Sequence, residues 1–307
     1  MPPLAVVRAA NAAALSTSYL PVGIFVGGTS GIGQGMAEAF ARHTKGNAHI
    51  VIVGRNRAAA ESIIAKFPKP TTPEAKHEFL QCDVSLMKNV DTTTSEILSR
   101  IPKINFLVMS PGFFSSKGRD DTEEGIDRKM AVHYYSRWKF TNDLVSRLVK
   151  ATEQGEDARV VSVLAAGHGG KVNLDDLGLK KTFTLRTCAA ETTTYNDLMI
   201  ESFFERYPSL SFIHAYPGAV RTGLAANSHT LSMKIAGTLM YTLGYPFTIS
   251  QDDSGEYMLH GMLTTAKTPG AYLVDKDGSD MGKPQFNSEE AKKKLWDHTV
   301  AETKVKA

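Results

Sequence analysis

Tyr195 is the residue whose type and surroundings first suggest chemistry in this chain. It lies in ETTTYNDLMI (191–200), and Met199 follows four residues later, which is about one turn of a helix. A tyrosine hydroxyl can pass a proton in catalysis, but its ordinary pKa of about 10 must be lowered by a nearby positive charge before it becomes a useful base. The Met199 thioether carries no charge. The segment therefore predicts either an altered catalytic site or a helix of the apolar core, and both interpretations stay open.

A glycine-rich turn gives the strongest indication of a ligand. The segment VGGTSGIG (26–33) follows an apolar run and leads into apolar residues at helical spacing. Turns at such junctions bind nucleotides in doubly wound sheets, where Gly27, Gly31 and Gly33 would permit the turn, the close approach of backbone to a pyrophosphate, and tight helix packing. The N-terminus of the helix would then face the phosphates. We expect a dinucleotide at this turn.

Two arginines indicate which dinucleotide is bound. The segment VGRN (53–56) ends the second apolar run, where the adenosine ribose should lie, and it contains Arg55 but no acidic residue. Arg57 follows two residues later. A guanidinium suits the 2′-phosphate of NADP, although two arginines at a helix start are also compatible with a purely solvated role. Asp83, after the third apolar run, is expected near the adenine edge.

Short apolar runs alternate with longer helical patterns along most of the chain. Strands that are apolar throughout and alternate with helices indicate a parallel sheet buried on both faces, a doubly wound α/β (Rossmann) fold. We predict an N-terminal arm (1–20), a single domain (21–285) that includes a substrate cap (223–268), and a C-terminal tail (286–307). Strands are expected at 22–26, 49–53, 77–84, 104–110, 158–164, 210–216 and 271–275, and helices at 31–43, 57–66, 87–101, 124–150 and around Tyr195.

Composition excludes several classes of protein. The 307 residues carry a net charge of +3, and no dense basic run indicates nucleic acid. Cys82 and Cys188 are the only cysteines, which is typical of a reducing compartment, and we expect a cytoplasmic protein without a metal site. No apolar run approaches the roughly 18 residues that span a bilayer, so no membrane-spanning segment is expected. The stretch 231–247 is expected at the substrate, although contact with a membrane surface or a partner subunit stays open.

These motifs, in this order, resemble the short-chain dehydrogenase/reductase family from about Val22 to Val274. The resemblance continues in MSPG (109–112), in the nicotinamide loop YPGAVRT (216–222), and in KVNLDDLGLKKTF (171–183), which is similar to an insert of the retinol-dehydrogenase-like branch. The whole chain also resembles uncharacterised fungal NAD(P)-binding members. The resemblance implies an NADP(H) site formed by Gly27, Thr29, Ser30, Gly31, Ile32, Gly33, Arg55, Asn56, Arg57, Asp83, Val84, Ser110, Pro111, Gly112, Tyr195, Pro217, Gly218, Val220 and Thr222.

The match fails at the catalytic residues. The family uses Asn, Ser, Tyr and Lys: Tyr is the acid/base, Ser holds the substrate oxygen, Lys lowers the pKa of Tyr, and Asn anchors a relay water. Aligned by the resemblance, Tyr is kept as Tyr195, Lys becomes Met199, Asn becomes His133, and Ser becomes Ala165. Catalytic residues are therefore expected to be Tyr195 and His133. His168 is a looser candidate for holding the substrate oxygen, and each histidine also has a purely structural interpretation.

We expect an NADPH-dependent reductase of a lipophilic ketone or aldehyde with a degenerate site. Tyr195 would donate the proton and His133 would assist. Two alternatives stay open: a non-redox isomerase or cyclase that keeps NADP(H) structurally, and an NADPH-binding pseudoenzyme. The resemblance also implies a possible homo-oligomer, since members of the family often associate through the helices that correspond to 124–150 and 192–206. An apolar rim for the substrate is expected from Phe113, Phe114, Tyr134, Tyr135, Trp138 and 231–247.

Overall fold

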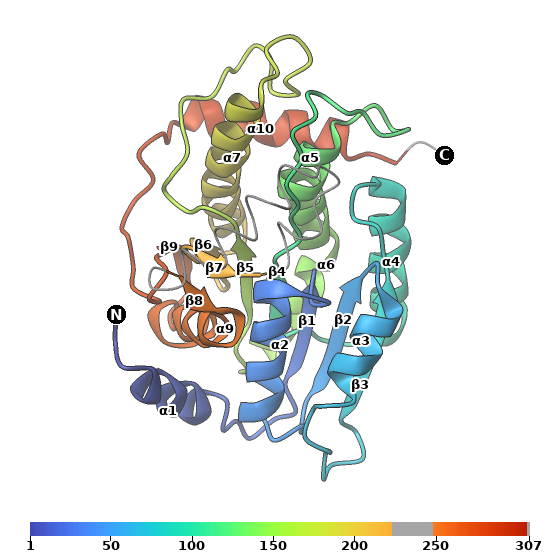
Figure 1. Ribbon diagram of the computed structural model, residues 1–307, viewed down its shortest axis with the longest axis vertical. Coiled ribbons are helices and arrows are strands. Elements are labelled where there is room, and N and C mark those ends of the chain that lie inside the picture. Colours follow the sequence, from blue (N-terminus) through green and yellow to red (C-terminus); the bar gives the residue numbers. More distant parts are fainter. Residues whose placement is uncertain (223–247, 306–307) are drawn as a thin grey trace.

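The centre of the molecule is a seven-stranded parallel sheet, which confirms the predicted doubly wound α/β fold (Figure 1). The structure is a computed structural model that describes residues 1–222 and 248–305. The strand order is β3-β2-β1-β4-β5-β6-β9. The strands are β1 (Val22–Val26), β2 (His49–Gly54), β3 (Lys76–Gln81), β4 (Phe106–Met109), β5 (Arg159–Val163), β6 (Ser211–Ala215) and β9 (Gly270–Val274).

Helices cover both faces of the sheet, and a separate apolar cluster fills each interface. Because every residue of β1, β4, β5 and β6 is buried, these strands need apolar side chains on both sides, which is why they appear as continuous apolar runs. One face carries α2 (Gly31–His43), α3 (Arg57–Ile64) and α9 (Gln251–His260), and the other carries α4 (Met87–Arg100), α6 (Ser136–Glu153) and α7 (Leu185–Arg206).

The segment expected as one helix at 124–150 is divided into three. A short turn, α5 (Arg128–Met130), leads into a π-helical turn, η1 (Ala131–Tyr135), and only then does α6 begin. Such π turns are rare and often occur at functional sites. This one presents the His133 carbonyl to Asn196 of α7, whose Nδ2 donates to it at 2.9 Å.

The expected substrate cap at 223–268 is only partly described, since 223–247 lie outside the described residues. The remainder does not form a cap. A two-residue strand, β8 (Ile249–Ser250), pairs with β7 (Val220–Arg221), and α9 then packs against α2 in the layer over the sheet before ending in a π turn, η3 (Gly261–Thr265). A Cβ at Gly255 would overlap the backbone of Gly35, so this packing depends on glycine in both helices.

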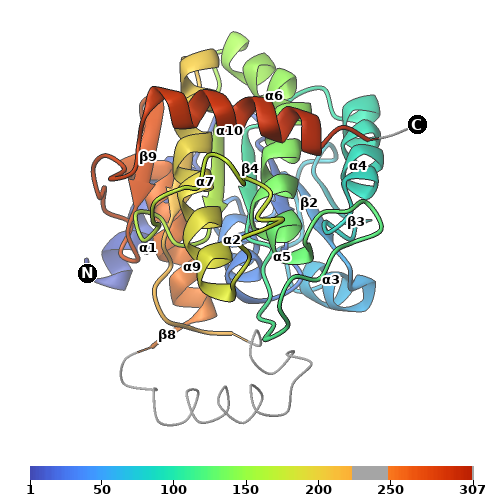
Figure 2. The ribbon, with the colours of Figure 1, turned by 90° about the horizontal axis from the view of Figure 1, so that it is seen from above.

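Two terminal helices were not predicted from the sequence. Within the N-terminal arm, α1 (Leu4–Ala14) packs on α9, and within the C-terminal tail, α10 (Glu289–Glu302) lies across α7 (Figure 2). In α1 all residues but Arg8 and Asn11 are apolar, and in α10 most are polar, so neither sequence shows a clear apolar stripe at helical spacing. Among the described helices, none combines the length and apolar character needed to cross a bilayer.

A buried carboxylate fastens α1 to the rest of the domain. The Glu256 side chain is fully buried and accepts hydrogen bonds from Asn11 (2.8 Å), Arg42 (3.0 Å) and His43 (2.9 Å). Burial alone would raise the pKa of Glu256, but its partners together, His43 first among them, lower it to about 2. The folded-state pKa thus lies below the unfolded value of about 4.5, so the carboxylate stabilises the fold above that pH.

We predict that this stabilisation, roughly 2–3 kcal/mol, is lost as the pH falls from about 4.5 towards 2. Urea unfolding at about pH 6 and about pH 3 would measure it. Glu256→Gln should be less stable than wild type at the higher pH and lose less stability on acidification. Glu61→Gln, which changes an exposed carboxylate, is the control. An identical pH dependence in wild type and Glu256→Gln would contradict this interpretation.

Candidate functional site

The glycine turn between β1 and α2 has the geometry of a phosphate cradle. Gly27 and Gly31 have φ of +83° and +59°, a region that residues with a Cβ rarely adopt. A Cβ at Gly33 would overlap the Ser110 hydroxyl, so the turn also requires glycine for packing. Ser30 precedes α2 but its side chain makes no capping hydrogen bond, which leaves the first amides of the helix available to an anion.

The turn that follows β4 lies directly against this cradle. A Cβ at Gly27 would lie 2.7 Å from the Pro111 nitrogen. The Ser110 Oγ is buried beside Gly33 and has no hydrogen-bond partner in the described part of the chain. Because buried polar atoms are nearly always hydrogen-bonded, an unpartnered hydroxyl at a cradle of glycines fits a polar group supplied by a bound nucleotide. The residues present therefore fit a dinucleotide.

Only one of the two predicted arginines is free at the adenosine end. Arg57 lies over the Phe79 ring at 5.0 Å and pairs with Glu61 at 3.7 Å. Asn56 caps α3 by accepting from the Ala59 amide. Arg55 is exposed and makes no ion pair with any described residue. The guanidinium available for a ligand at this strand end is therefore that of Arg55.

The remaining predicted cofactor residues lie at the same carboxyl edge of the sheet. A Cβ at Gly31 would lie 3.3 Å from Thr222, so the loop after β6 closes over the glycine turn. Thr29 packs against Gly54 at the end of β2, and one Asp83 oxygen accepts from the Ser85 amide. The other residues predicted at the cofactor are Pro217 and Val84, which are buried, Gly218, which has φ +71°, Val220 of β7, and Ile32, which is half-buried.

Tyr195 is not at this edge, and the prediction that it is catalytic and touches the cofactor is wrong. Its side chain is fully buried, with the ring 5.1 Å from that of Tyr134. Its hydroxyl donates to Glu191 Oε2 (2.7 Å) and to the Leu177 carbonyl (3.1 Å). Burial, and then the Glu191 carboxylate, raise the pKa of Tyr195 far above its ordinary value. Tyr195 thus anchors the inserted segment 171–183 to α7.

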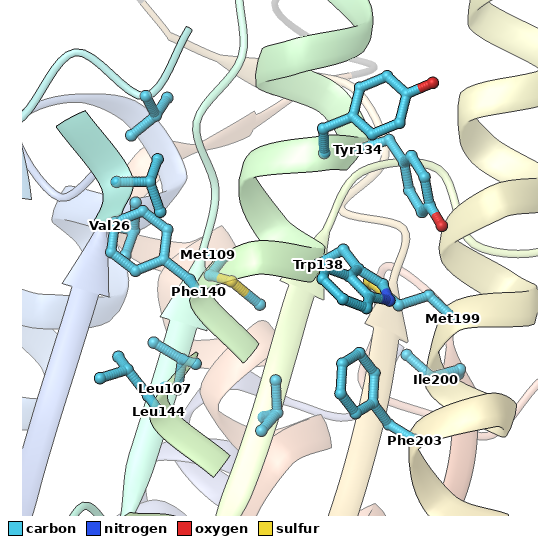
Figure 3. Close-up of a cluster of buried hydrophobic side chains, with 14 of the residues drawn as sticks. Val26, Leu107, Met109, Tyr134, Trp138, Phe140, Leu144, Met199, Ile200 and Phe203 are labelled. Atoms are coloured by element: carbon cyan, nitrogen blue, oxygen red, sulfur yellow. The ribbon is translucent and has the colours of Figure 1, made fainter. Parts of the chain in front are cut away.

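Met199 likewise belongs to the core and does not occupy a catalytic lysine position. It is 3% exposed and lies beside Trp138, on the face of α7 that meets α6 (Figure 3). The apolar-core interpretation of ETTTYNDLMI is therefore correct. The one-turn spacing of Tyr195 and Met199 reflects a buried helix face.

The face of α7 that contacts the strands is formed by other residues than Tyr195 and Met199. Asn196 bonds Ser162 of β5 at 2.7 Å, and Asp197 bonds His214 of β6 at 2.5 Å. Because α7 runs back along parallel strands, earlier residues on this face approach the carboxyl edge of the sheet. Those residues are Ala189 and Thr193, and Thr193 points roughly 160° away from Tyr195 on a helix of 3.6 residues per turn. A tyrosine–lysine pair serving this edge would occupy 189 and 193, where the chain has alanine and threonine.

A buried arginine that sequence reasoning missed organises the strand ends. Arg137 is 1% exposed and donates to the Pro111 carbonyl (2.6 Å), the Val163 carbonyl (2.8 Å) and the Ser162 hydroxyl (2.7 Å). Burial lowers its pKa to about 9, so it remains charged at neutral pH. The sequence signal was an arginine within the aromatic and apolar run AVHYYSRWKF (131–140).

His133 reaches the edge of the site but is not a cation. Its half-buried ring lies 5.8 Å from that of Phe113, and Nε2 accepts a long hydrogen bond from the Phe113 amide (3.5 Å). A Cβ at Gly112 would lie 3.9 Å from the same nitrogen. Burial, then the charges of Arg137 and Lys129, lower the pKa of His133 to about 3. Its imidazole is therefore neutral at neutral pH, and any assistance from His133 must come from the neutral ring.

The loop after β5 is held by a second pair that was missed. The Ala165 amide donates to His214 Nε2 at 3.2 Å, and His214 Nδ1 bonds Asp197. His168, the looser candidate, is exposed and lies against the Tyr216 ring at 4.3 Å. A buried Asp–His pair in contact with backbone fixes the loop. Residues so far apart in sequence give no local signal that could have found it.

The expected apolar rim is reduced to two residues of the described part. Phe114 is 55% exposed and Phe113 is partly buried beside His133. Tyr134, Tyr135 and Trp138 are each at most 3% exposed and belong to the core, so their assignment to the rim is wrong. Residues 231–247 lie outside the described residues.

Comparisons with known proteins agree with this geometry. The family model described as "Enoyl-(Acyl carrier protein) reductase" matches residues 26–173. "Oxidoreductase AN1596" of Emericella nidulans is 32% identical over 96% of this chain and 96% of its own length. "Short-chain dehydrogenase/reductase SAT2" of Stachybotrys chartarum is 28% identical over 98% of this chain and 96% of its own length.

Solved structures show the same fold at low sequence identity. An uncharacterised protein from Mycobacterium paratuberculosis superposes with a TM-score of 0.66 at 16% identity, covering 96% of this chain and 97% of its own. A short-chain dehydrogenase from Sphingobium yanoikuyae, in complex with NADPH, superposes with a TM-score of 0.58 at 18% identity and covers 92% and 94%.

The core position of Met199 gives a direct prediction. Met199→Lys should lower the free energy of unfolding by about 3 kcal/mol or more, because it places an ammonium group without a partner among apolar side chains. Urea unfolding measures the change, with Met281→Lys, at a residue 37% exposed, as the control. A Met199→Lys variant as stable as wild type would contradict the core assignment.

Proposed function

Since the chain belongs to the short-chain dehydrogenase/reductase family, we propose that it is an NADPH-dependent reductase of a lipophilic ketone or aldehyde whose site lacks the usual tyrosine–lysine pair. The observation that carries the proposal is the closed nucleotide cradle, in which the glycine turn, the unpartnered Ser110 hydroxyl and the Thr222 loop meet. NADPH bound there would supply a hydride. The protein residues would bind it and orient the carbonyl.

The preference for NADP(H) rests on Arg55. Solved neighbours include one in complex with NADPH and one complexed with NADH, so fold similarity does not choose between the two cofactors. At the end of β2 this chain offers a free guanidinium and no carboxylate in Gly54, Arg55 and Asn56. A guanidinium attracts a phosphate through charge-assisted hydrogen bonds and gives no comparable gain with a ribose hydroxyl.

The proposed direction, reduction, follows from proton balance. Alcohol oxidation needs a base to take the hydroxyl proton. His133, whose Nε2 would lie 3.9 Å from a Cβ at Gly112, is a weak base because its pKa is about 3. Arg137, which donates to the Pro111 carbonyl of the same turn, is a cation at neutral pH and cannot take the proton. Carbonyl reduction instead forms an alkoxide, which is basic enough to take a proton from water or from a neutral donor. We propose that the neutral His133 ring, with Nε2 accepting from Phe113 and its proton on Nδ1, orients the carbonyl or that water.

A lipophilic substrate is proposed from the side chains around this edge. Phe114 and Met281 are exposed large apolar residues, and a Cβ at Gly167, in the loop after β5, would lie 3.1 Å from the Met281 methyl. Phe113 lies beside His133. Apolar walls with few polar groups are typical of sites for small apolar molecules.

A second candidate is a non-redox catalyst that keeps the dinucleotide as a structural element. It is favoured by one observation: the positions that would place an acid/base and a substrate-oxygen donor at this edge are Ala189, Thr193 and Ala165. Turnover that proceeds equally with NADP⁺ and NADPH, without change in nicotinamide absorbance, would identify it. Consumption of NADPH in step with the carbonyl would instead identify the reductase.

The cofactor proposal is tested by two matched arginine variants. Arg55→Ala should raise the Kd for NADPH about 10- to 100-fold and change the Kd for NADH less than about threefold, because it removes a charged donor from the 2′-phosphate only. Arg57→Ala should change the Kd for NADPH less than about threefold, since that guanidinium is engaged with Phe79 and Glu61. Titration of cofactor fluorescence measures both.

An equal loss of NADPH and NADH affinity in Arg55→Ala, or a larger effect of Arg57→Ala, would contradict the assignment. The reductase itself is tested by incubating the wild-type protein with NADPH and a panel of apolar ketones and aldehydes. Loss of nicotinamide absorbance with formation of the alcohol is expected for at least one member. Tight NADPH binding without hydride transfer to any of them would overturn it.

A further inference from the structure

The C-terminal helix α10 is firmly packed although it lies outside the sheet and its covering helices. Ser288 caps it by accepting from the Ala291 amide. Trp296 packs against Phe203 and Trp138, with ring centroids 5.0 and 5.2 Å apart, and the Arg206 guanidinium lies 3.6 Å over its indole. Figure 2 shows α10 crossing α7 on the side away from the sheet. These contacts hold the helix in one position on α6 and α7.

Two side chains of α10, those of Thr299 and His298, form hydrogen bonds with tyrosines of the π turn η1. The Tyr134 hydroxyl lies 2.8 Å from Thr299 Oγ1, and the Tyr135 hydroxyl lies 2.8 Å from His298 Nε2. The Thr299 hydroxyl donates its hydrogen bond to the Leu295 carbonyl at 2.6 Å, so in the pair with Tyr134 the tyrosine hydroxyl is the donor. Both tyrosines are buried, and each hydroxyl therefore depends on its partner in α10.

Both tyrosines stand next to His133 in a turn of only five residues, Ala131–Tyr135. A π turn is less stable than the α-helix around it, so it persists only where tertiary contacts select it. The other ties to η1 come from the domain itself: Asn196 holds the His133 carbonyl at 2.9 Å, and Arg137 Nε donates to the Val132 carbonyl at 3.4 Å. The contacts from α10 add the partners of the two tyrosine hydroxyls.

We propose that α10 is a latch that holds η1 in its π-helical form, with Thr299 and His298 as positioning residues that keep the His133 ring at the edge of the cofactor site. The latch itself rests only on these contacts. Its consequence for catalysis also rests on the reductase function proposed above. The chain therefore needs its C-terminal helix for the geometry of a residue about 165 positions earlier in the sequence.

The test compares two buried threonines one turn apart, Thr299 in α10 and Thr303 at its C-terminal cap. Thr299→Val removes the acceptor for Tyr134 with little change in volume. Thr303→Val removes a hydroxyl whose one bond among the described residues is to the Thr299 carbonyl, four residues earlier. Hydrogen–deuterium exchange of the amides in 131–137 is measured in the full chain. Thr299→Val should speed it about 2- to 10-fold, the loss expected for one buried hydrogen bond, while Thr299→Ser and Thr303→Val leave it near the wild-type rate.

A double-mutant cycle isolates the pair. Tyr134→Phe should speed the same amides to a similar extent, and Tyr134→Phe/Thr299→Val should be no faster than the faster single variant, since both remove one interaction. In nitrogen NMR of the imidazoles, the His133 signals, assigned with His133→Gln, should move in Thr299→Val and not in Thr303→Val. Equal effects of Thr299→Val and Thr303→Val, or multiplicative effects in the double variant, would overturn the latch.

Activity separates the latch from the proposed function. If wild type reduces a carbonyl of the panel, kcat should be lower in Thr299→Val and close to the wild-type value in Thr299→Ser. The Kd for NADPH should stay within about twofold of wild type in both variants, because neither changes the glycine cradle. If wild type reduces none, the exchange and NMR results still decide the latch, and only the reductase proposal fails.

Discussion

The buried guanidinium of Arg137 is the interaction on which the candidate site depends. It joins the ends of β4 and β5 to the turn η1 through the carbonyls of Pro111 and Val163 and the hydroxyl of Ser162. None of these partners is charged, so burial of the cation costs free energy, which its lowered pKa reflects. Hydrogen bonds from a charged donor, each contributing about 1.5–3 kcal/mol, offset that cost only while all acceptors stay in place.

The hydrogen bonds of Arg137 belong to a longer chain of contacts between the strand ends and α7. Ser162 passes the connection on to Asn196 of α7, and Asn196 in turn holds the carbonyl of His133. Arg137, Ser162 and Asn196 are thus committed to one another and to backbone carbonyls, while the Ser110 hydroxyl is left without a partner in the described part of the chain. The same cation helps to lower the pKa of His133 and keeps that ring neutral. Among the described residues, the nucleotide cradle therefore lies beside few groups that can exchange protons.

Features set by residues that are neighbours in the sequence could be predicted, whereas contacts between distant segments could not. The glycine turn and the apolar strands could be predicted, because backbone conformation and burial on both faces leave their mark within a few residues. Tyr195 was misassigned because four-residue spacing is shared by a catalytic pair and by a core helix. Only contacts with Leu177 and Glu191, in the insert and on α7, decide between them. Arg137, the His214–Asp197 pair and the latch of α10 join distant segments, so no local pattern could reveal them.

The most direct test of this account is the behaviour of Arg137→Lys and Arg137→Met. Lysine keeps the charge but cannot reach three acceptors with a planar fork, and methionine keeps much of the volume without the charge. The account predicts that both variants are less stable to urea than wild type and bind NADPH more weakly, with faster amide exchange in the Pro111–Gly112 turn and in η1. An Arg137→Met protein with wild-type stability and wild-type NADPH affinity would contradict it.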